Sequence, residues 1–339
     1  MSVGHRVGYR YAFSFAAMLL LIAVATPIAL TSAGATSEVG HWSGGTDLGL
    51  GAASAISCAS TKFCEAIGVT TGTDTATTFN GKRWSSPRTI ARYSGIVTSL
   101  SCPVDGWCAA ITDLAEVTVL RHGRWSKLAT IDPNPGPPYP GMAVSLSCTS
   151  STFCMAVDAQ GMSEIYDGSG WAKPRLIDQD YPLNDVSCGA AQRCVAVDGL
   201  GRVLSFDEGR WSTPVVIDDT ALTGVSCATV TSCIAVDLVG RALVFGAGRW
   251  GRPLSIDQSS ASPLSVSCPA VGSCLVADAS GRVLTLADGR WSGAEQIDNS
   301  DGAQGSLAAV ACVHGSGGPC FAVDSFGDSL ENQDPFGGH

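Results

Sequence analysis

The chain is poor in charged side chains, and basic side chains are the scarcer kind. Charged residues make up 15% of the 339 residues, and 20 Lys and Arg stand against 30 Asp and Glu, which gives a net charge of −10. Proteins that bind the phosphate backbone of nucleic acids do so with clusters of Lys and Arg. The composition therefore argues against a nucleic-acid partner.

Low charge does not make this chain a disordered one. Hydrophobic residues account for 45% of the sequence, and there are 40 glycines. Disordered segments combine low hydrophobicity with high net charge, whereas abundant glycine among apolar residues suits short strands joined by turns. The composition favours a strand-and-turn protein with a sizeable core.

A long apolar run, YAFSFAAMLLLIAVATPIAL, occupies residues 11–30 behind the basic residues Arg6 and Arg10. A short basic region followed by an apolar stretch and small residues is typical of a secretory signal peptide, and a run of about 20 residues is also long enough to span a bilayer. We expect residues 1–33 to be a signal peptide or an N-terminal membrane anchor, followed by a linker over residues 34–39. No cysteine lies near Ala33, which argues against a lipoprotein anchor.

The 14 cysteines all lie beyond residue 33 and fall into seven close pairs. An even number of cysteines in an exported chain indicates disulfides, and zinc hairpins favour shorter spacings, of about two to four residues between ligands. We predict seven disulfides and no metal. The pairs are Cys58 and Cys64, Cys102 and Cys108, Cys148 and Cys154, Cys188 and Cys194, Cys227 and Cys233, Cys268 and Cys274, and Cys312 and Cys320.

The cysteine pairs mark a repeat. First cysteines of successive pairs are separated by 39 to 46 residues, and each repeat divides into four short apolar segments with Gly, Asp or Ser at the joints. Repeats of about 40–45 residues with four strands each are typical of β-propeller blades. The last repeat lacks its fourth strand, but GHWSGGTDLG at residues 40–49 is a separate copy of that strand, with Trp42 in the place of the repeated tryptophan.

The ends of the repeat array therefore predict a closed ring. Pairing the N-terminal strand with the C-terminal blade removes two exposed sheet edges. We predict an all-β, seven-bladed β-propeller of four-stranded blades over residues 40–331, closed by the N-terminal strand, and a flexible tail over residues 332–339.

The repeat pattern is Ser-Cys-x5-Cys-x-Ala-Val-Asp-x-x-Gly-x-x-Leu, followed by Gly-x-Trp-Ser-x-Pro. It resembles the secreted Cys-pair β-propeller repeats of actinobacteria, and it is similar to the extracellular sensor propellers of membrane Ser/Thr kinases. The resemblance implies the propeller fold and a sensing or binding role outside the cell, and it implies little about the ligand.

Two series of aspartates recur in the repeats. The first follows Ala-Val or Val-Ala near a turn and the second ends the fourth strand, so propeller topology places both on one face of the ring. We predict that they cap turns there, and that this face is acidic and attracts cations or basic ligands. Whether they bind calcium is left open. The two series are Asp158, Asp198, Asp237, Asp278 and Asp324, and Asp132, Asp178, Asp218, Asp257 and Asp298.

The expected inner strands offer little chemistry. They read AISC, SLSC, SLSC, DVSC, GVSC, SVSC and AVAC, with Asp185 as the one ionisable residue. A sialidase-like site needs an arginine cluster, an acid and a Tyr/Glu pair. We therefore predict a non-catalytic ligand-binding or sensing module at the cell envelope, without a cofactor. The alternative is a cell-envelope carbohydrate hydrolase or lyase of sialidase-like propeller type, built from loop carboxylates.

Binding residues are best sought where the repeat is interrupted. The connection between the second and third blades contains DPNPGPPYPG at residues 132–141, and tyrosines lie on the neighbouring connections. These residues predict a patch for a carbohydrate or a peptide or protein ligand, on a monomer that meets the membrane only through a possible N-terminal anchor. The alternative is that Pro and Tyr merely pack the loops onto the ring. The candidate ligand-binding residues are Tyr93, Asp132, Tyr139, Asp180 and Tyr181.

Overall fold

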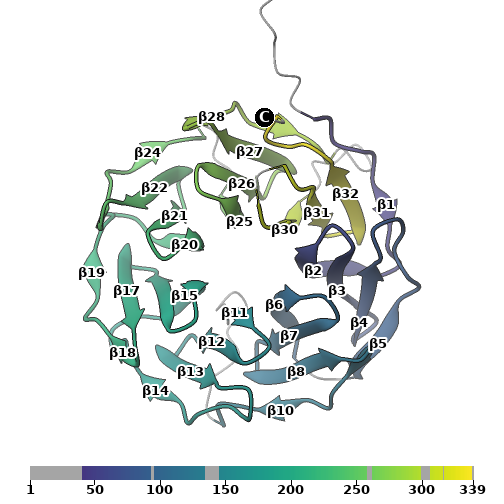
Figure 1. Ribbon diagram of the computed structural model, residues 1–339, viewed down its shortest axis with the longest axis horizontal. Coiled ribbons are helices and arrows are strands. Elements are labelled where there is room, and N and C mark those ends of the chain that lie inside the picture. Colours follow the sequence, from purple (N-terminus) through teal and green to yellow (C-terminus); the bar gives the residue numbers. More distant parts are fainter. Residues whose placement is uncertain are drawn as a thin grey trace, which may run out of the picture. The chain divides into compact units, whose positions relative to one another are not determined.

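The structure is a computed structural model that describes residues 40–92, 95–133, 145–257, 262–298, 306–315 and 317–337. These residues form seven antiparallel sheets arranged as the blades of a ring (Figure 1). The described part of the chain contains strands and turns and no helix, and so no helix that could cross a membrane. The predicted all-β, seven-bladed propeller is confirmed.

Strands run outward from the centre of the ring in chain order within each of the first six blades. Blade 1 consists of β2 (Ala52–Ser60), β3 (Phe63–Thr70), β4 (Thr73–Phe79) and β5 (Arg88–Arg92). Blade 2 consists of β6 (Val97–Val104), β7 (Trp107–Thr112), β8 (Glu116–Arg121), β9 (Arg124–Trp125) and β10 (Ala129–Thr130). Blade 3 consists of β11 (Ser145–Ser150), β12 (Phe153–Val157), β13 (Met162–Tyr166) and β14 (Arg175–Leu176).

In four blades the outermost strand is split into two short segments, which both pair with the third strand. Blade 4 consists of β15 (Leu183–Ala190), β16 (Arg193–Asp198), β17 (Arg202–Asp207), β18 (Arg210–Trp211) and β19 (Val215–Val216). Blade 5 consists of β20 (Leu222–Thr229), β21 (Ser232–Asp237), β22 (Arg241–Gly246), β23 (Arg249–Trp250) and β24 (Leu254–Ser255). Blade 6 consists of β25 (Pro263–Ala270), β26 (Ser273–Asp278), β27 (Arg282–Ala287), β28 (Arg290–Trp291) and β29 (Glu295–Gln296). Blade 7 consists of β30 (Leu307–Cys312), β31 (Cys320–Asp324), β32 (Asp328–Asn332) and β1 (Thr46–Asp47).

Hydrophobic cores lie between neighbouring blades. In one core, Val197 and Val203 of blade 4 pack with Leu222 and Leu243 of blade 5. A blade can bury its apolar side chains only against the next blade, and full burial of one such side chain contributes about 1.5–3 kcal/mol. The repeated Trp250 packs against this core. The ring therefore depends on every interface being filled.

Hydrogen bonds between blades add a second kind of contact around the centre. The serine before the first cysteine of a blade accepts a hydrogen bond from the backbone N–H of the first cysteine of the next blade, as Ser187 Oγ does from Cys227 at 2.9 Å. Six blade pairs share this contact at 2.9–3.0 Å, through Ser57, Ser101, Ser147, Ser187, Ser226 and Ser267. The Ser-Cys dipeptide of the repeat is thus explained by contacts between blades.

The N-terminal strand closes the ring as predicted. Strand β1 pairs antiparallel with β32, with Thr46 opposite Ser329. Trp42 is 5% exposed and packs in the same core as Leu330 and Phe336. Packing thus continues to Phe336, five residues past the expected end of the propeller at residue 331.

All seven predicted disulfides are present, and no cysteine is free. Each one joins the first and second strands of a blade, as Cys188 and Cys194 join β15 to β16. Disulfides persist in oxidising compartments. Seven of them indicate an oxidising, extracellular environment.

Ring closure can be tested at Trp42. Removing this side chain leaves a cavity where the chain ends meet, so Trp42→Ala should lower the free energy of unfolding by about 3–5 kcal/mol in chemical denaturation. The matched change Trp211→Ala removes a half-buried tryptophan within a blade of continuous chain, and it should cost less. Equal losses in the two variants would contradict the special role of the N-terminal strand.

Candidate functional site

Polar groups gather in two parts of the ring: the junctions between blades on one face, and the channel lined by the innermost strands. We call the first of these the loop face. It carries the turns between second and third strands and the connections from one blade to the next. Leu183, where the connection enters β15, lies opposite Asp198 at the turn that follows β16.

The junction between blades 3 and 4 shows what the repeated aspartates do. Asp198 Oδ1 accepts hydrogen bonds from the backbone N–H groups of Leu200 and Arg202, at 2.9 and 2.8 Å, and so caps the turn. Asp198 Oδ2 accepts from Arg202 Nε at 2.5 Å, and Arg202 Nη2 reaches Asp178 of blade 3 at 2.7 Å. One arginine therefore holds an aspartate from each of two blades.

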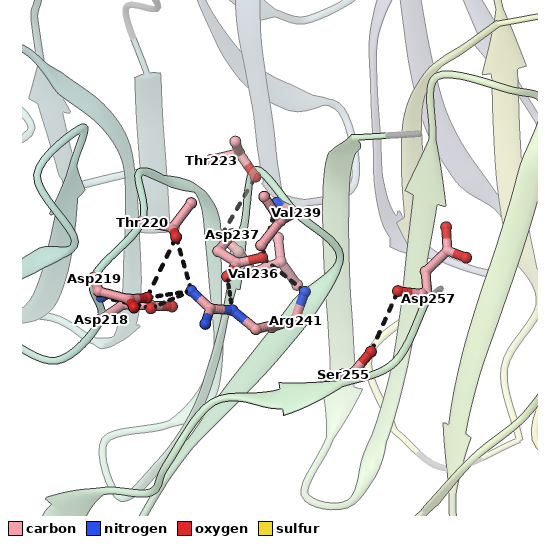
Figure 2. Close-up of polar contacts among 10 residues, drawn as sticks. All are labelled: Asp218, Asp219, Thr220, Thr223, Val236, Asp237, Val239, Arg241, Ser255 and Asp257. Carbon is pink, nitrogen blue, oxygen red and sulfur yellow. Dashed lines mark hydrogen bonds and ion pairs between the residues drawn. The ribbon is translucent and has the colours of Figure 1, made fainter. Parts of the chain in front are cut away.

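The next two junctions repeat this arrangement. Figure 2 shows Arg241 beside Asp237 of its own turn and extending to Asp218 and Asp219 on the preceding connection. At the junction between blades 5 and 6, Arg282 joins Asp278 to Asp257, the latter at 2.8 Å. At three successive junctions one arginine thus pairs with buried aspartates of two blades, an arrangement that we call an arginine clamp.

The repeated aspartates that the arginines contact are buried, which makes these ion pairs important for stability. All ten repeated aspartates are between 0 and 7% exposed. An unpaired buried carboxylate is costly, and burial raises its pKa. Burial and the hydrogen bond with Asp219 raise the pKa of Asp218 to about 6, although Arg241 acts to lower it. The predicted turn capping is confirmed for the first series, whose members accept backbone N–H groups two and four residues further on: Asp158, Asp198, Asp237, Asp278 and Asp324. The ten aspartates do not make the loop face acidic as predicted, because they lie inside the junctions.

The junction between blades 2 and 3 contains Asp132, one of the predicted ligand-binding residues. Asp132 is 3% exposed and lies beside the buried Asp158 and Glu164. Burial, together with the charges of Asp158 and Asp132, raises the pKa of Glu164 to about 8. Asp132 therefore belongs to a buried carboxylate cluster, where a bulky ligand has no access to it.

The structure describes two of the four remaining predicted ligand-binding residues. Tyr93 and Tyr139 lie outside the described residues. Asp180 is exposed on the loop face and pairs with Arg202 Nη1 at 3.3 Å. Tyr181 is 43% exposed and its ring lies against Gly199, where an added Cβ would come within 2.5 Å of Tyr181 Cε1. Asp180 and Tyr181 thus both lie beside the blade 4 turn that carries Arg202.

The channel contains two cavities of about 310 and 420 Å³, which share wall residues such as Ile56 and Ser187. The cavity at the loop face is lined at its mouth by uncharged polar residues, among them Ser54, Thr98, Asn184 and Thr223. Among the described residues that line the two cavities, Asp185 and His314 are the ionisable side chains. They lie in different cavities, Asp185 in the one at the loop face and His314 in the other.

Asp185 serves the scaffold. Its Oδ1 accepts hydrogen bonds from Ser145 Oγ at 2.5 Å and Val186 N at 2.8 Å, and its Oδ2 accepts from Val225 N at 2.8 Å. Burial raises its pKa to about 6, and these hydrogen bonds lower it. Ser265, three residues before its own cysteine as Asp185 is, likewise accepts from the next blade, at Val310 N. Asp185 therefore links three blades.

Comparisons with known proteins bear on the fold. No protein-family model matches the chain, and no curated protein matches it. Many solved structures resemble it, and three of them have TM-scores of 0.65 to 0.68. The chain is a β-propeller.

The first of these structures is YCF48 bound to D1 peptide, with 16% identity over 86% of this chain and 96% of that one and a TM-score of 0.65. The WD40 β-propeller domain of Doa1 has 10% identity over 87% of this chain and 97% of that one, with a TM-score of 0.67. A catalytically inactive virginiamycin B lyase from Staphylococcus aureus with quinupristin has 10% identity over 86% of this chain and 99% of that one, with a TM-score of 0.68. At these identities the likeness shows the fold alone.

The arginine clamp can be tested at Arg241. Arg241→Met leaves Asp218 and Asp237 buried without their cation, so the free energy of unfolding should fall by about 3 kcal/mol at pH 7.5. Arg241 lowers the pKa of Asp218, so this pKa should rise further without the arginine, and the loss should shrink as the pH falls toward about 4 and Asp218 takes up a proton.

The control for this variant is Arg249→Met, which removes an exposed arginine of the same blade and should change stability by less than about 0.5 kcal/mol. Chemical denaturation at both pH values measures the effect. A pH-independent loss, or equal losses in the two variants, would contradict the role of Arg241 as a clamp.

Proposed function

We propose that the protein is an extracellular, non-catalytic binding module that receives a peptide segment of a cell-envelope protein at the channel mouth on the loop face. The observation that carries this proposal is the uncharged polar lining of that mouth. Hydroxyl and amide groups match the donors and acceptors of a peptide backbone without requiring a charged ligand.

The mouth residues keep hydrogen-bonding capacity for a ligand. Asn184 Nδ2 donates to Leu222 O at 2.7 Å, which leaves a second N–H and the side-chain carbonyl of Asn184 to be satisfied. Thr223 Oγ1 donates to Val236 O at 3.3 Å and retains its acceptor lone pairs. A peptide backbone that enters the mouth would find both kinds of partner there.

The placement of the carboxylates favours binding over catalysis. A glycosidase needs two carboxyl groups that reach the substrate from its two sides. The convergent carboxylates of the described residues, Asp132, Asp158 and Glu164, are 1–3% exposed and lie between blades. Asp185, on the channel wall, has both oxygens engaged by scaffold donors. A carbohydrate hydrolase or lyase is therefore the weaker proposal.

The likeness to YCF48 bound to D1 peptide supports a peptide ligand for a ring of this kind. We further propose that Asp180 and Tyr181 extend the binding surface on the loop face, together with Tyr93 and Tyr139. Residues 1–33 would export the protein or tether it to the membrane, and the propeller would act as a monomer with a sensing role like that of the kinase-linked propellers it resembles.

The proposal is tested with a displayed library of random peptides, selected against the secreted protein. Selected peptides should bind Thr223→Arg at least about tenfold more weakly, because the long side chain fills the mouth. The matched control Val216→Arg adds the same side chain on the outer strand, where Val216 is 68% exposed, and should bind as the unchanged protein does.

Both variants should keep the melting temperature of the unchanged protein. Failure to select any peptide, or peptides that bind Thr223→Arg unchanged, would contradict the proposed site. Cleavage of a fluorogenic glycoside panel by the unchanged protein, but not by Thr223→Arg, would instead support the enzyme.

A further inference from the structure

The junction between blades 2 and 3 departs from the arginine-clamped junctions at two positions. Four residues after the turn aspartate, where the next three blades have Arg202, Arg241 and Arg282, blade 3 has Met162. Six residues after that aspartate, where they have Leu204, Leu243 and Leu284, it has Glu164.

Strand register confirms that Glu164 occupies a core leucine position. Glu164 lies opposite Ala156 of β12, as Leu204 lies opposite Ala196 and Leu243 opposite Ala235. Leu204 and Leu243 are 0% exposed, and Glu164 is 2% exposed. The junction has therefore lost its cation and gained a buried carboxyl group.

The exchange places three carboxyl groups together. Asp132 comes from the end of blade 2, and Asp158 and Glu164 come from blade 3. One oxygen of each lies within 4.8 Å of the other two, and all three residues are buried. Like charges this close in a buried site repel strongly unless a cation or protons neutralise them.

The hydrogen bonds of Asp158 show which atom lacks a partner. Asp158 Oδ1 accepts from the backbone N–H groups of Gln160 and Met162, at 2.8 and 3.0 Å, as in the other turns. Asp158 Oδ2 receives no hydrogen bond from an N–H group of the described residues, whereas the matching Oδ2 atoms of Asp198 and Asp278 receive one from Nε of an arginine. The missing donor is the arginine.

Glu164 also has a buried oxygen without a hydrogen-bond donor in the described part of the chain. Its Oε1 is fully buried and has no hydrogen-bond donor among the described residues. In the clamped junctions the same position carries a leucine, so the turn does not require a polar group there. The oxygen of Glu164 lacks a hydrogen-bond donor within the described ranges and lies beside the oxygens of Asp132 and Asp158. Together these carboxylates form a set of oxygen ligands that suits a cation.

We propose that a divalent cation, with Ca²⁺ as the fitting ion, binds between Asp132, Asp158 and Glu164 and replaces the arginine that joins blades elsewhere. Ca²⁺ is bound by oxygen ligands and accepts carboxylates together with water. The cation would link blade 2 to blade 3 where Arg202 links blade 3 to blade 4. This role is independent of the proposed peptide-binding function.

The first test measures the melting temperature of the secreted protein after removal of metal with EDTA and exchange into metal-free buffer at pH 7.5. Addition of Ca²⁺ should raise the melting temperature by about 5 °C at a hundredfold excess over the dissociation constant. Calorimetric titration of the metal-free protein with Ca²⁺ should give one site. No rise up to millimolar Ca²⁺, with no heat of binding, would overturn the proposal.

Variants locate the site. Glu164→Gln keeps the shape of the side chain but removes a charged ligand, so it should weaken Ca²⁺ binding at least about tenfold. The double variant Met162→Arg with Glu164→Leu restores the clamp of the other junctions and should melt independently of Ca²⁺. Asp207→Asn, at an exposed carboxylate of blade 4, is the matched control and should respond as the unchanged protein does. An undiminished Ca²⁺ response in the double variant would overturn the proposed location, even if that variant folds well.

The pH dependence separates a cation from protons. Three carboxyl groups that face one another in a buried site repel more strongly as they ionise, unless a cation joins them. The melting temperature of the metal-free protein should therefore fall with rising pH more steeply than that of the double variant. Ca²⁺ should flatten the fall, and an identical pH profile with and without Ca²⁺ would show that protons alone neutralise the cluster and would overturn the proposal.

Discussion

The ring depends on neutralising carboxylates that two neighbouring blades bury against each other. At five junctions the aspartate that caps a turn of one blade meets the aspartate that ends the outermost strand of the preceding blade, so closing the junction removes two acids from water together. Removing such charges from water costs several kcal/mol per ion unless a partner satisfies them. Arg202, Arg241 and Arg282 supply that partner at three successive junctions. The ion pairs inside these junctions thus give neighbouring blades a directional contact that hydrophobic packing alone does not provide.

Around the channel the blades are joined by hydrogen bonds to backbone N–H groups and not by arginine ion pairs. Serine hydroxyls accept backbone N–H groups of the next blade, and Asp185 does so where a serine stands in other blades. The recurrent polar residues are consequently occupied by the scaffold. What is left for recognition is the uncharged rim of the channel and the loop face, where Asp180 and Tyr181 are exposed.

Much of the fold could be predicted from sequence, because cysteine spacing and the orphan strand around Trp42 fix the repeat length and the ring closure. The positions of the aspartates in the repeat also predict the face of the ring on which they lie. Their burial could not be predicted, because it depends on contacts between an arginine and the aspartate of the preceding blade. The alternation of side chains along a strand does not reveal such contacts between blades. Met162 and Glu164 can be recognised from the sequence as exceptions to the repeat. Their significance becomes clear only from the contacts between arginine and aspartate that join the other blades. The tyrosine patch stays a prediction, since Tyr93 and Tyr139 lie outside the described residues.

The most direct test of charge neutralisation at the junctions is anomalous X-ray diffraction from crystals of the protein grown with Ca²⁺. We predict an anomalous peak between the carboxylate oxygens of Asp132, Asp158 and Glu164, at about 2.3–2.6 Å from each, and no such peak at the arginine-clamped junctions. Absence of the peak, with Glu164 hydrogen-bonded directly to Asp158 at about 2.5–2.7 Å, would contradict the account, because protons would then do what the arginines do elsewhere.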